Sequence, residues 1–322
     1  MLAPVFEYRK RRIEMAKSKK RQRGYSSVNS ALLQRSVRKC WPIFLLPLLA
    51  AFAMGFIYPF CYGAYLSFCK FRIISKTEWV GFENYKRAFQ DDGFKHAFWY
   101  TAMFAIVSLI IINVVAFALA YILTMGIKGT NVFRTVFFMP NLIGGIVLGK
   151  IWSMIINGIL IKHGTDIITN AKWGFWGLII VVCWQQIGYM MIIYIAGLQA
   201  VSEDINEAAK IDGATRMQTL FRVTIPNVMP SITICTFLSL TNGFKLFDQN
   251  LALTNGLPLL DAAASTKVGA TEMLALNIVN TFNSNGKYMR GTAQAKAVIF
   301  FILVATISII QLKATRSKEV QQ

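Results

Sequence analysis

The sequence is poor in the residues that usually carry metal binding or acid–base catalysis. Of its 322 residues, only 2 are histidines and 5 are cysteines. The cysteines form no C-x-x-C pair and fall in or beside apolar runs, where a cysteine is most simply a small apolar filler. The sequence therefore argues against a metal site built from histidine and cysteine, and against a histidine-based catalytic triad.

Acidic residues are also scarce, with 15 Asp and Glu against 34 Lys and Arg and a formal net charge of +19. The long apolar runs contain no acidic residue in their cores, and Asp248 lies at the edge of one of them. Carriers driven by protons or sodium ions usually bind the ion through intramembrane carboxylates or histidines. This absence favours a neutral solute that is moved by an outside source of energy.

Long apolar runs dominate what remains, since 55% of the residues are hydrophobic. A helix needs roughly 20 consecutive apolar residues to cross the hydrocarbon core of a bilayer. Such stretches occupy residues 41–68, 97–125, 132–156, 174–200, 229–247 and 295–312. The sequence therefore predicts an all-α integral membrane protein with about six transmembrane helices.

Much of the positive charge lies before the first apolar run, in residues 9–23. A basic arm of this kind could bind nucleic acid, but in a multi-pass protein it favours a cytoplasmic tail beside anionic lipid, with no nucleic acid. The following run is too long for a secretory signal, and Met1 and Met15 both stay open as the start. We expect residues 1–40 to form this tail, residues 41–312 a membrane domain and residues 313–322 a second cytoplasmic tail.

One short motif imitates a nucleotide site. The segment from Gly144 to Lys150 has the G-x-x-x-x-G-K spacing of a phosphate-binding loop, but Ile151 replaces the Ser or Thr that would bind magnesium, and the segment lies inside an apolar run. We interpret Gly145 and Gly149 as a small-residue face for close helix packing. Lys150 either reaches outward or faces a wet cavity. The chain is expected to have no nucleotide cofactor of its own.

With six spans, residues 201–230 form a cytoplasmic loop that contains two predicted short helices. Asp204 and Glu207 have the spacing of a capping box, as do Thr215 and Gln218, and the second helix is predicted to end at Pro226. Asp212 and Gly213 between the two helices supply a sharp bend. From the physics alone, the loop could equally be an ordinary amphipathic connector.

The order of residues in this loop resembles the coupling-loop signature of permease subunits in bacterial ATP-binding cassette importers, of the carbohydrate type. The pattern E-A-A-x-x-D-G-A is followed by I-x-P-x-x-x-P. The residues matching its first part are Glu207, Ala208, Ala209, Asp212, Gly213 and Ala214.

The resemblance extends from Trp41 to the C-terminus and is similar in several places to the larger membrane subunit of the maltose transporter. The segments that carry it include Trp79-Val-Gly-Phe-Glu-Asn-Tyr85, Phe137-Phe-Met-Pro140 and Thr254-Asn-Gly-Leu-Pro258. Leu257 departs from the family pattern, where a second glycine is usual, and Lys150 and Lys296 stand in normally apolar neighbourhoods. These departures leave the solute open.

The resemblance implies a non-catalytic subunit of a bacterial cell membrane, with both termini cytoplasmic. Its implied partners are a second homologous permease, two ATPase subunits that bind ATP and magnesium, an external solute-binding protein, membrane lipids and a sugar, with an oligosaccharide as the first choice. A polyol or a glycerol phosphodiester is the alternative solute, and an unrelated membrane scaffold or enzyme is the alternative class.

The resemblance also places solute binding near the bilayer midplane, in the fourth and fifth runs. Ser239 and Asn242 share one helix face there, and Gln185, Gln186 and Tyr189 lie within little more than one turn. Amides and hydroxyls can exchange hydrogen bonds with sugar hydroxyls, and an aromatic ring can stack on a sugar ring. The same residues could instead make interhelical hydrogen bonds, which are common in membrane bundles.

Overall fold

The structure is a computed structural model that describes residues 43, 45–73, 75–260, 268–286 and 288–317. The whole predicted N-terminal tail, residues 1–40, and the last five residues lie outside this part. Within the described part, five helices are long and apolar enough to cross a membrane, or six when one bent pair counts as a single span. The prediction of an α-helical membrane protein with about six spans is confirmed.

The chain divides into two compact units, Met1–Gly63 and Ala64–Gln322. The described part of the first unit is helical and belongs to the candidate span Leu45–Leu66, which includes η1 (Ala53–Ile57) and α2 (Tyr58–Leu66). The elements of the second unit are β1 (Cys69–Ile73), β2 (Lys76–Trp79), α3 (Glu83–Gln90), α4 (Asp92–Thr124), α5 (Thr130–Phe138), η2 (Met139–Leu142), α6 (Gly145–Leu160), η3 (Ile161–His163), α7 (Ala171–Ala200), α8 (Glu203–Ile211), α9 (Arg216–Thr219), η4 (Leu220–Thr224), α10 (Ile225–Asn227), α11 (Met229–Phe244), α12 (Asp248–Leu253), α13 (Leu274–Asn283) and α14 (Met289–Arg316).

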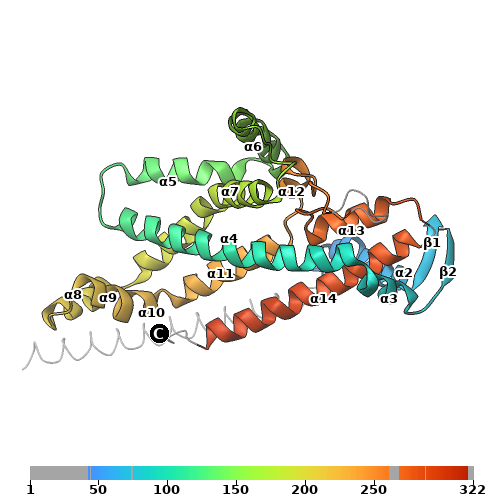
Figure 1. The fold of residues 1–322 in the computed structure, drawn as a ribbon. Helices are drawn as coiled ribbons and strands as arrows, with labels where there is room; N and C mark the ends of the chain where they lie inside the picture. Colours follow the sequence, from blue (N-terminus) through green and yellow to red (C-terminus); the bar gives the residue numbers. More distant parts are fainter. Residues whose placement is uncertain (1–42, 44, 74, 261–267, 287, 318–322) are drawn as a thin grey trace, which may run out of the picture. The chain divides into compact units, whose positions relative to one another are not determined.

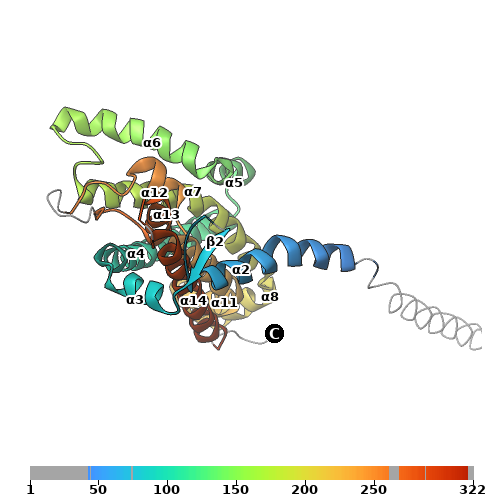
Figure 2. The same cartoon turned by 90° about the vertical axis from the view of Figure 1, so that its right-hand side faces the viewer.

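The predicted third span, residues 132–156, is not one helix. The short 3-10 turn η2 contains Pro140 and separates α5 from α6. Figure 1 shows α5 from the side and α6 nearly end-on, whereas Figure 2 shows α6 along its length. Proline cannot donate the backbone hydrogen bond that a continuous helix requires, so the helix breaks. Because proline is itself apolar, the apolar run continues across the break. The spanning candidate in this region is Gly145–His163.

The core of the second unit is built around α4, which packs against α7 and α11. Its fully buried positions include the small residues Ala97, Ala105, Ala116 and Ala120. Small residues allow helix backbones to approach closely in a membrane bundle. At Gly243 of α11, an added Cβ would lie 3.1 Å from the Cα of Ala105, so a side chain there would require α4 to shift by a few tenths of an ångström.

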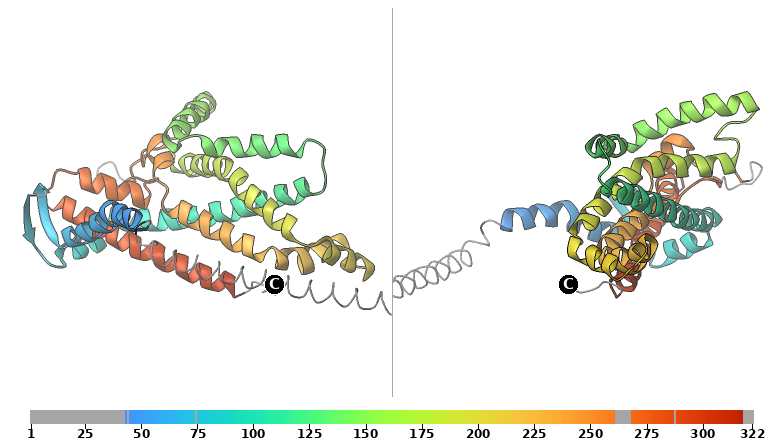
Figure 3. Two further views of the ribbon diagram at one scale, coloured as in Figure 1. Left: turned by 180° about the vertical axis from the view of Figure 1, so that it is seen from behind. Right: turned by 90° about the vertical axis from the view of Figure 1, so that its left-hand side faces the viewer.

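The two ends of the second unit differ in structure. Figure 1 shows β1, β2 and α3 at one end and α8, α9 and α10 at the other, and the view from behind in Figure 3 shows the same separation. At the first end, the buried Asn84 donates its amide to the carbonyls of Ser67 (2.8 Å) and Cys69 (2.9 Å). The asparagine of the Trp79–Tyr85 motif therefore joins α3 to the hairpin of antiparallel strands β1 and β2.

Candidate functional site

A chain of buried amides lies where the α5–α6 break meets α7 and α12. Gln185 of α7 donates Nε2 to the carbonyl of Ile143 at 3.0 Å, and Gln249 of α12 donates Nε2 to Oε1 of Gln185 at 2.6 Å. The two glutamine residues are 6% and 8% exposed. Burying amides is costly unless they are paired, so these bonds hold the three elements in a defined arrangement.

A second amide pair uses the next residue of α7 and is more open. Asn242 of α11 donates Nδ2 to Oε1 of Gln186 at 3.4 Å, which is a long hydrogen bond, and both residues are half-buried. Within the described part of the chain, neither side chain makes a further hydrogen bond. Their remaining donors and acceptors are the groups that a polar solute could use. We call Gln185, Gln186, Asn242 and Gln249 the amide cluster.

Ser239 lies in a different polar group. Its hydroxyl accepts from Nδ2 of Asn113 on α4 at 3.1 Å, and Oδ1 of Asn113 accepts from the hydroxyl of Tyr194 on α7 at 2.7 Å. Ser239 and Tyr194 are buried. This group joins α4, α7 and α11 inside the bundle, which is the interhelical role that the sequence left open for such residues.

Sequence reasoning proposed Gln185, Gln186 and Asn242; the structure pairs Asn242 with Gln186, and Gln185 with Gln249, which was missed. Gln249 was hard to find because it follows the fifth apolar run and is placed only by the turn into α12. Tyr189 is half-buried on α7. Asn113, also missed as a partner, appeared in the sequence only as an interruption of an apolar run.

The segment from Gly144 to Lys150, which has the spacing of a phosphate-binding loop, forms a contact between two helices, as predicted. A Cβ on Gly145 would lie 2.6 Å from the Cβ of Asp248, and one on Gly149 would lie 2.8 Å from the Cβ of Ala252. Both glycines therefore allow α12 to pack directly on α6. Lys150 is exposed on α6.

The loop between α7 and α11 forms a helical knob, which we define as residues 202–227. Its first helix begins differently from the prediction, because the hydroxyl of Ser202, rather than the side chain of Asp204, caps α8 by accepting from the backbone N–H of Asp204. Ser202 immediately precedes the helix and satisfies the free N–H groups there. The predicted capping box of Thr215 and Gln218 at α9 is confirmed.

Gly213 ends α8 in a left-handed conformation, with φ of +76°. Its N–H bonds the carbonyl of Lys210, and the N–H of Ala214 bonds the carbonyl of Ala209. This is the pairing of a Schellman motif, in which glycine avoids the steric cost of a side chain. The predicted sharp bend at Asp212 and Gly213 is confirmed.

The predicted end of the second helix at Pro226 is wrong. The helical segment Arg216–Asn227 passes through Pro226 and is then bent by 71° from Met229–Phe244. Pro226 lies at the start of α10, directly after the π-helical segment η4, and its missing N–H removes one backbone hydrogen bond without ending the segment. The bend falls one residue beyond α10, at Val228.

The knob presents both carboxylate and apolar groups. Glu207 and Ala208 are exposed, while Ala209 is buried against the rest of the unit. Ile211 is 86% exposed, and Met217 and Phe221 are also exposed. Sequence reasoning missed Ile211 because it occupies an unspecified position of the pattern E-A-A-x-x-D-G-A, next to the specified Asp212 and Gly213. An exposed group of large apolar side chains on a helical projection is typical of a surface that contacts another protein.

Comparison with known proteins gives a family to this arrangement. Residues 112–316 match the family described as "Binding-protein-dependent transport system inner membrane component". The chain belongs to this family. The matched range contains the amide cluster, the knob and α14.

Several transport permeases are similar to the chain over most of its length. It is 39% identical over 287 residues to the probable starch degradation products transport system permease protein AmyD of Thermoanaerobacterium thermosulfurigenes, covering 87% of this chain and 94% of that protein. It is 30% identical to the multiple sugar-binding transport system permease protein MsmF of Streptococcus mutans, covering 87% and 96%. The chain is therefore an inner-membrane transport component, as the resemblance implied.

The fold of this transport component is similar to that of a solved bacterial transporter. A membrane chain of an ATP-binding cassette transporter that imports the acidic polysaccharide alginate superposes with a TM-score of 0.71 at 20% identity, covering 88% of this chain and 98% of that one. At this identity the likeness concerns the fold alone.

Proposed function

We propose that this chain is the permease subunit of an ATP-binding cassette importer and forms, with a second homologous permease, the path for a sugar. An oligosaccharide is the first choice of solute. The observation that carries the proposal is the 39% identity, over 287 residues, to a permease named for starch degradation products. The chain itself is not an enzyme in this proposal.

The amide cluster supports a solute rich in hydroxyl groups. The long bond from Asn242 to Gln186 leaves amide donors and acceptors with no other partner among the described residues. Sugar hydroxyls both give and accept hydrogen bonds, and amides do the same. We assign Asn242 and Gln186 to direct contact with the solute. Gln185 and Gln249 hold the amide cluster in place, and Tyr189 offers an aromatic ring beside the cluster on which a sugar ring could stack.

The knob supports coupling to an ATPase. In our proposal, Glu207 offers a carboxylate to a basic group of an ATPase subunit, and Ile211 adds an apolar contact. Ala208 and Ala209 have small side chains, so they allow the ATPase surface to approach closely. Asp212, Gly213 and Ala214 form the rigid corner that transmits the movement. Two ATPase subunits bind ATP and magnesium, and an external binding protein delivers the solute at the opposite end.

This arrangement gives an orientation in the bacterial cell membrane. The knob is at one end of the second unit and the β1–β2 hairpin is at the other (Figure 1). If the ATPase subunits are cytoplasmic, the knob is cytoplasmic and the hairpin is external. Lys313 and Arg316, near the end of α14, then lie on the cytoplasmic side, where basic residues are favoured.

The solute is tested most simply on the external binding protein, by the shift of its thermal midpoint with a panel of oligosaccharides, polyols and glycerol phosphodiesters. We expect stabilisation by an oligosaccharide, since ligand binding to the folded state raises the midpoint. Stabilisation by a glycerol phosphodiester alone would favour the alternative solute, for which the exposed Lys150 offers a positive charge. Stabilisation by no member of the panel would contradict a sugar or polyol importer.

A further inference from the structure

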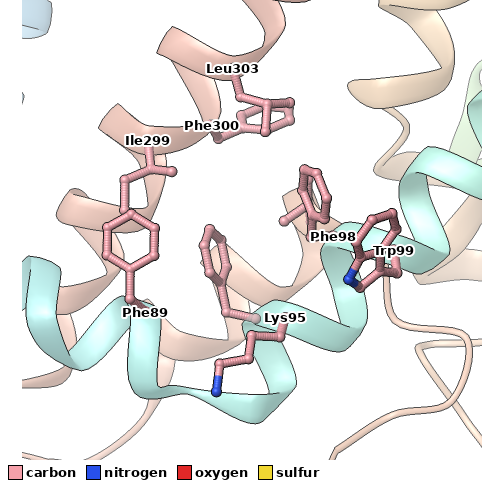
Figure 4. A pocket seen from close by; sticks show the side chains of 9 residues that line it. Phe89, Lys95, Phe98, Trp99, Ile299, Phe300 and Leu303 are labelled. Carbon is pink, nitrogen blue, oxygen red and sulfur yellow. The ribbon is translucent and has the colours of Figure 1, made fainter.

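An apolar groove lies between α3, α4, α13 and α14, and none of the residues that line it belongs to the amide cluster or the knob. It has a volume of about 230 Å³. The residues that line it are Phe89, Phe94, Lys95, Phe98, Trp99, Leu274, Ile299, Phe300 and Leu303. Figure 4 shows their aromatic and aliphatic side chains around a common space. All of these side chains except Lys95 are apolar.

A partly buried ion pair joins the elements that form the groove. Nζ of Lys296 on α14 lies 2.5 Å from Oδ2 of Asp91, the residue that caps α4, and donates to Asn277 and Thr281 of α13 at 2.8 and 2.7 Å. These bonds join the three long elements that form the walls. The groove is therefore a preformed feature of the bundle.

The position of the groove relates it to the membrane surface. α4 and α14 are both candidate spans, and the groove lies at the N-terminal end of α4 and near the middle of α14. Phe89 is 60% exposed and Trp99 is 71% exposed. Trp and Lys concentrate where a span leaves the hydrocarbon core, because one part of each side chain is apolar and the other is polar.

Among the described residues that line the groove, Lys95 is the one with a charged side chain. Figure 4 shows its nitrogen directed away from the aromatic rings. Nζ lies 2.9 Å from Oδ1 of Asp92, and both side chains of this pair are exposed. An exposed pair of this kind contributes little to stability, so an anionic group in the surrounding lipid can compete with Asp92 for the ammonium group.

We propose that the groove binds one membrane phospholipid, with an acyl chain between Phe98 and Leu303 and the headgroup phosphate at Lys95. Acyl chains need no hydrogen-bond partners, and the lining side chains offer none apart from the Trp99 indole N–H and Lys95. A sugar would leave its hydroxyls unpaired there. The proposal does not rest on the identity of the transported solute, because it uses only the embedding of α4 and α14 in the membrane.

The test is native mass spectrometry of the full chain, purified with the subunits that accompany it, after delipidation and titration with phosphatidylglycerol. We expect one tightly bound lipid per chain. Leu303→Trp fills the groove and should weaken this binding at least tenfold. The matched control is Ile302→Trp on the exposed side of α14, which should bind like the wild type.

A second pair of variants tests the headgroup contact without altering the groove wall. Lys95→Gln should weaken phosphatidylglycerol binding about fivefold, the equivalent of the roughly 1 kcal/mol that one basic residue contributes at an anionic membrane surface. Lys86→Gln, another exposed lysine, should leave it unchanged. Unchanged binding in both Leu303→Trp and Lys95→Gln would overturn the proposal, as would efficient cross-linking of an Ile299→Cys variant to a second permease.

Discussion

Lys296 and Asp91 form an ion pair across 205 residues of sequence, with Nζ of the lysine 2.5 Å from Oδ2 of the aspartate. The lysine side chain is 0% exposed, whereas the aspartate is 36% exposed. The pair links the beginning of α4 to α14. The charge of the buried lysine therefore depends on the ion pair for stabilisation, whereas the carboxylate of the aspartate can also be hydrated.

This asymmetry predicts unequal effects of removing either partner. Asp91→Asn should lower the free energy of unfolding by about 3 kcal/mol, because it leaves a buried ammonium group without its counter-ion, while asparagine still caps α4. Lys296→Met should cost less. Unfolding in mixed micelles titrated with dodecyl sulfate measures both.

The exposed Asp92 gives a matched control, since Asp92→Asn should change the free energy of unfolding by less than about 1 kcal/mol. The double variant of Asp91 and Lys296 should resemble Lys296→Met rather than the sum of the two losses. An Asp91→Asn variant as stable as Asp92→Asn would show that the ion pair does not hold α4 to α14.

Gly188 predicts a second stability effect, at the contact of α7 with α5. A Cβ there would overlap the backbone oxygen of Phe137, so Gly188→Ala must push two helices apart. We expect a loss of about 2 kcal/mol or more, in the range for overpacked cores, measured in the same unfolding assay.

Gly158 on α6 serves as its control, because a Cβ at this position would meet nothing within 4 Å. Gly158→Ala should stabilise the helix by about 0.5 to 1 kcal/mol, since alanine loses less conformational freedom than glycine. Equal effects of the two substitutions would mean that the close approach of α5 and α7 is not part of the folded state.

Asn242→Ala should weaken import at limiting solute. It removes one amide from the solute side of the amide cluster, and a lost neutral hydrogen bond costs about 1 kcal/mol, which is close to a fivefold rise in the half-saturating concentration. Basal ATPase activity and assembly should be kept. Uptake kinetics measured against solute concentration give the answer.

Thr236 on the same helix is the control for this substitution, since its hydroxyl pairs with Gln311 away from the amide cluster. Thr236→Ala should leave the half-saturating concentration unchanged. If Asn242→Ala behaves like Thr236→Ala, Asn242 is only an interhelical contact.

The knob predicts a loss of coupling without a loss of folding. Gly213 has room for a side chain but has a positive φ, so only its backbone limits substitution. Gly213→Asn should be tolerated, because asparagine enters the left-handed region readily, and Gly213→Val should abolish transport while the protein still inserts. Uptake and membrane content are measured together.

Docking is measured separately, by pull-down of the ATPase subunit. Glu207→Ala should weaken it, and so should Ile211→Ser, because each removes one kind of contact from the exposed face of α8. Should Glu207→Ala, Ile211→Ser and Gly213→Val all retain the ATPase and transport at the wild-type rate, the knob is only a connector.

Local chemistry was predictable from the sequence, whereas long-range partners were not. The capping box of Thr215 and Gln218 and the bend at Gly213 depend on neighbours within a few residues, and both were predicted correctly. Asp204 was chosen as a cap because its spacing to Glu207 fits, but Ser202 is better placed at the actual start of α8. Hydropathy found the third apolar run and missed its break, because an apolar proline does not interrupt a hydropathy pattern.

The polar residues of the membrane domain show the same limit. Lys296 appeared only as an anomaly in an apolar run, since Asp91, Asn277 and Thr281 are brought to it by folding. Ser239 and Asn242 were grouped by helical spacing, yet one contacts α4 and the other α7. A helix face indicates which residues point in a similar direction, and only the neighbouring helices decide what they contact.

ATP-driven uptake into proteoliposomes that contain the chain with its co-purified subunits tests the central claim most directly. With the binding protein on the side of the β1–β2 hairpin, we predict that labelled maltooligosaccharide accumulates when ATP and magnesium are present on the side of the knob. Accumulation should be lost with ADP. Equal accumulation with ADP, or accumulation driven by an imposed proton gradient, would contradict the account.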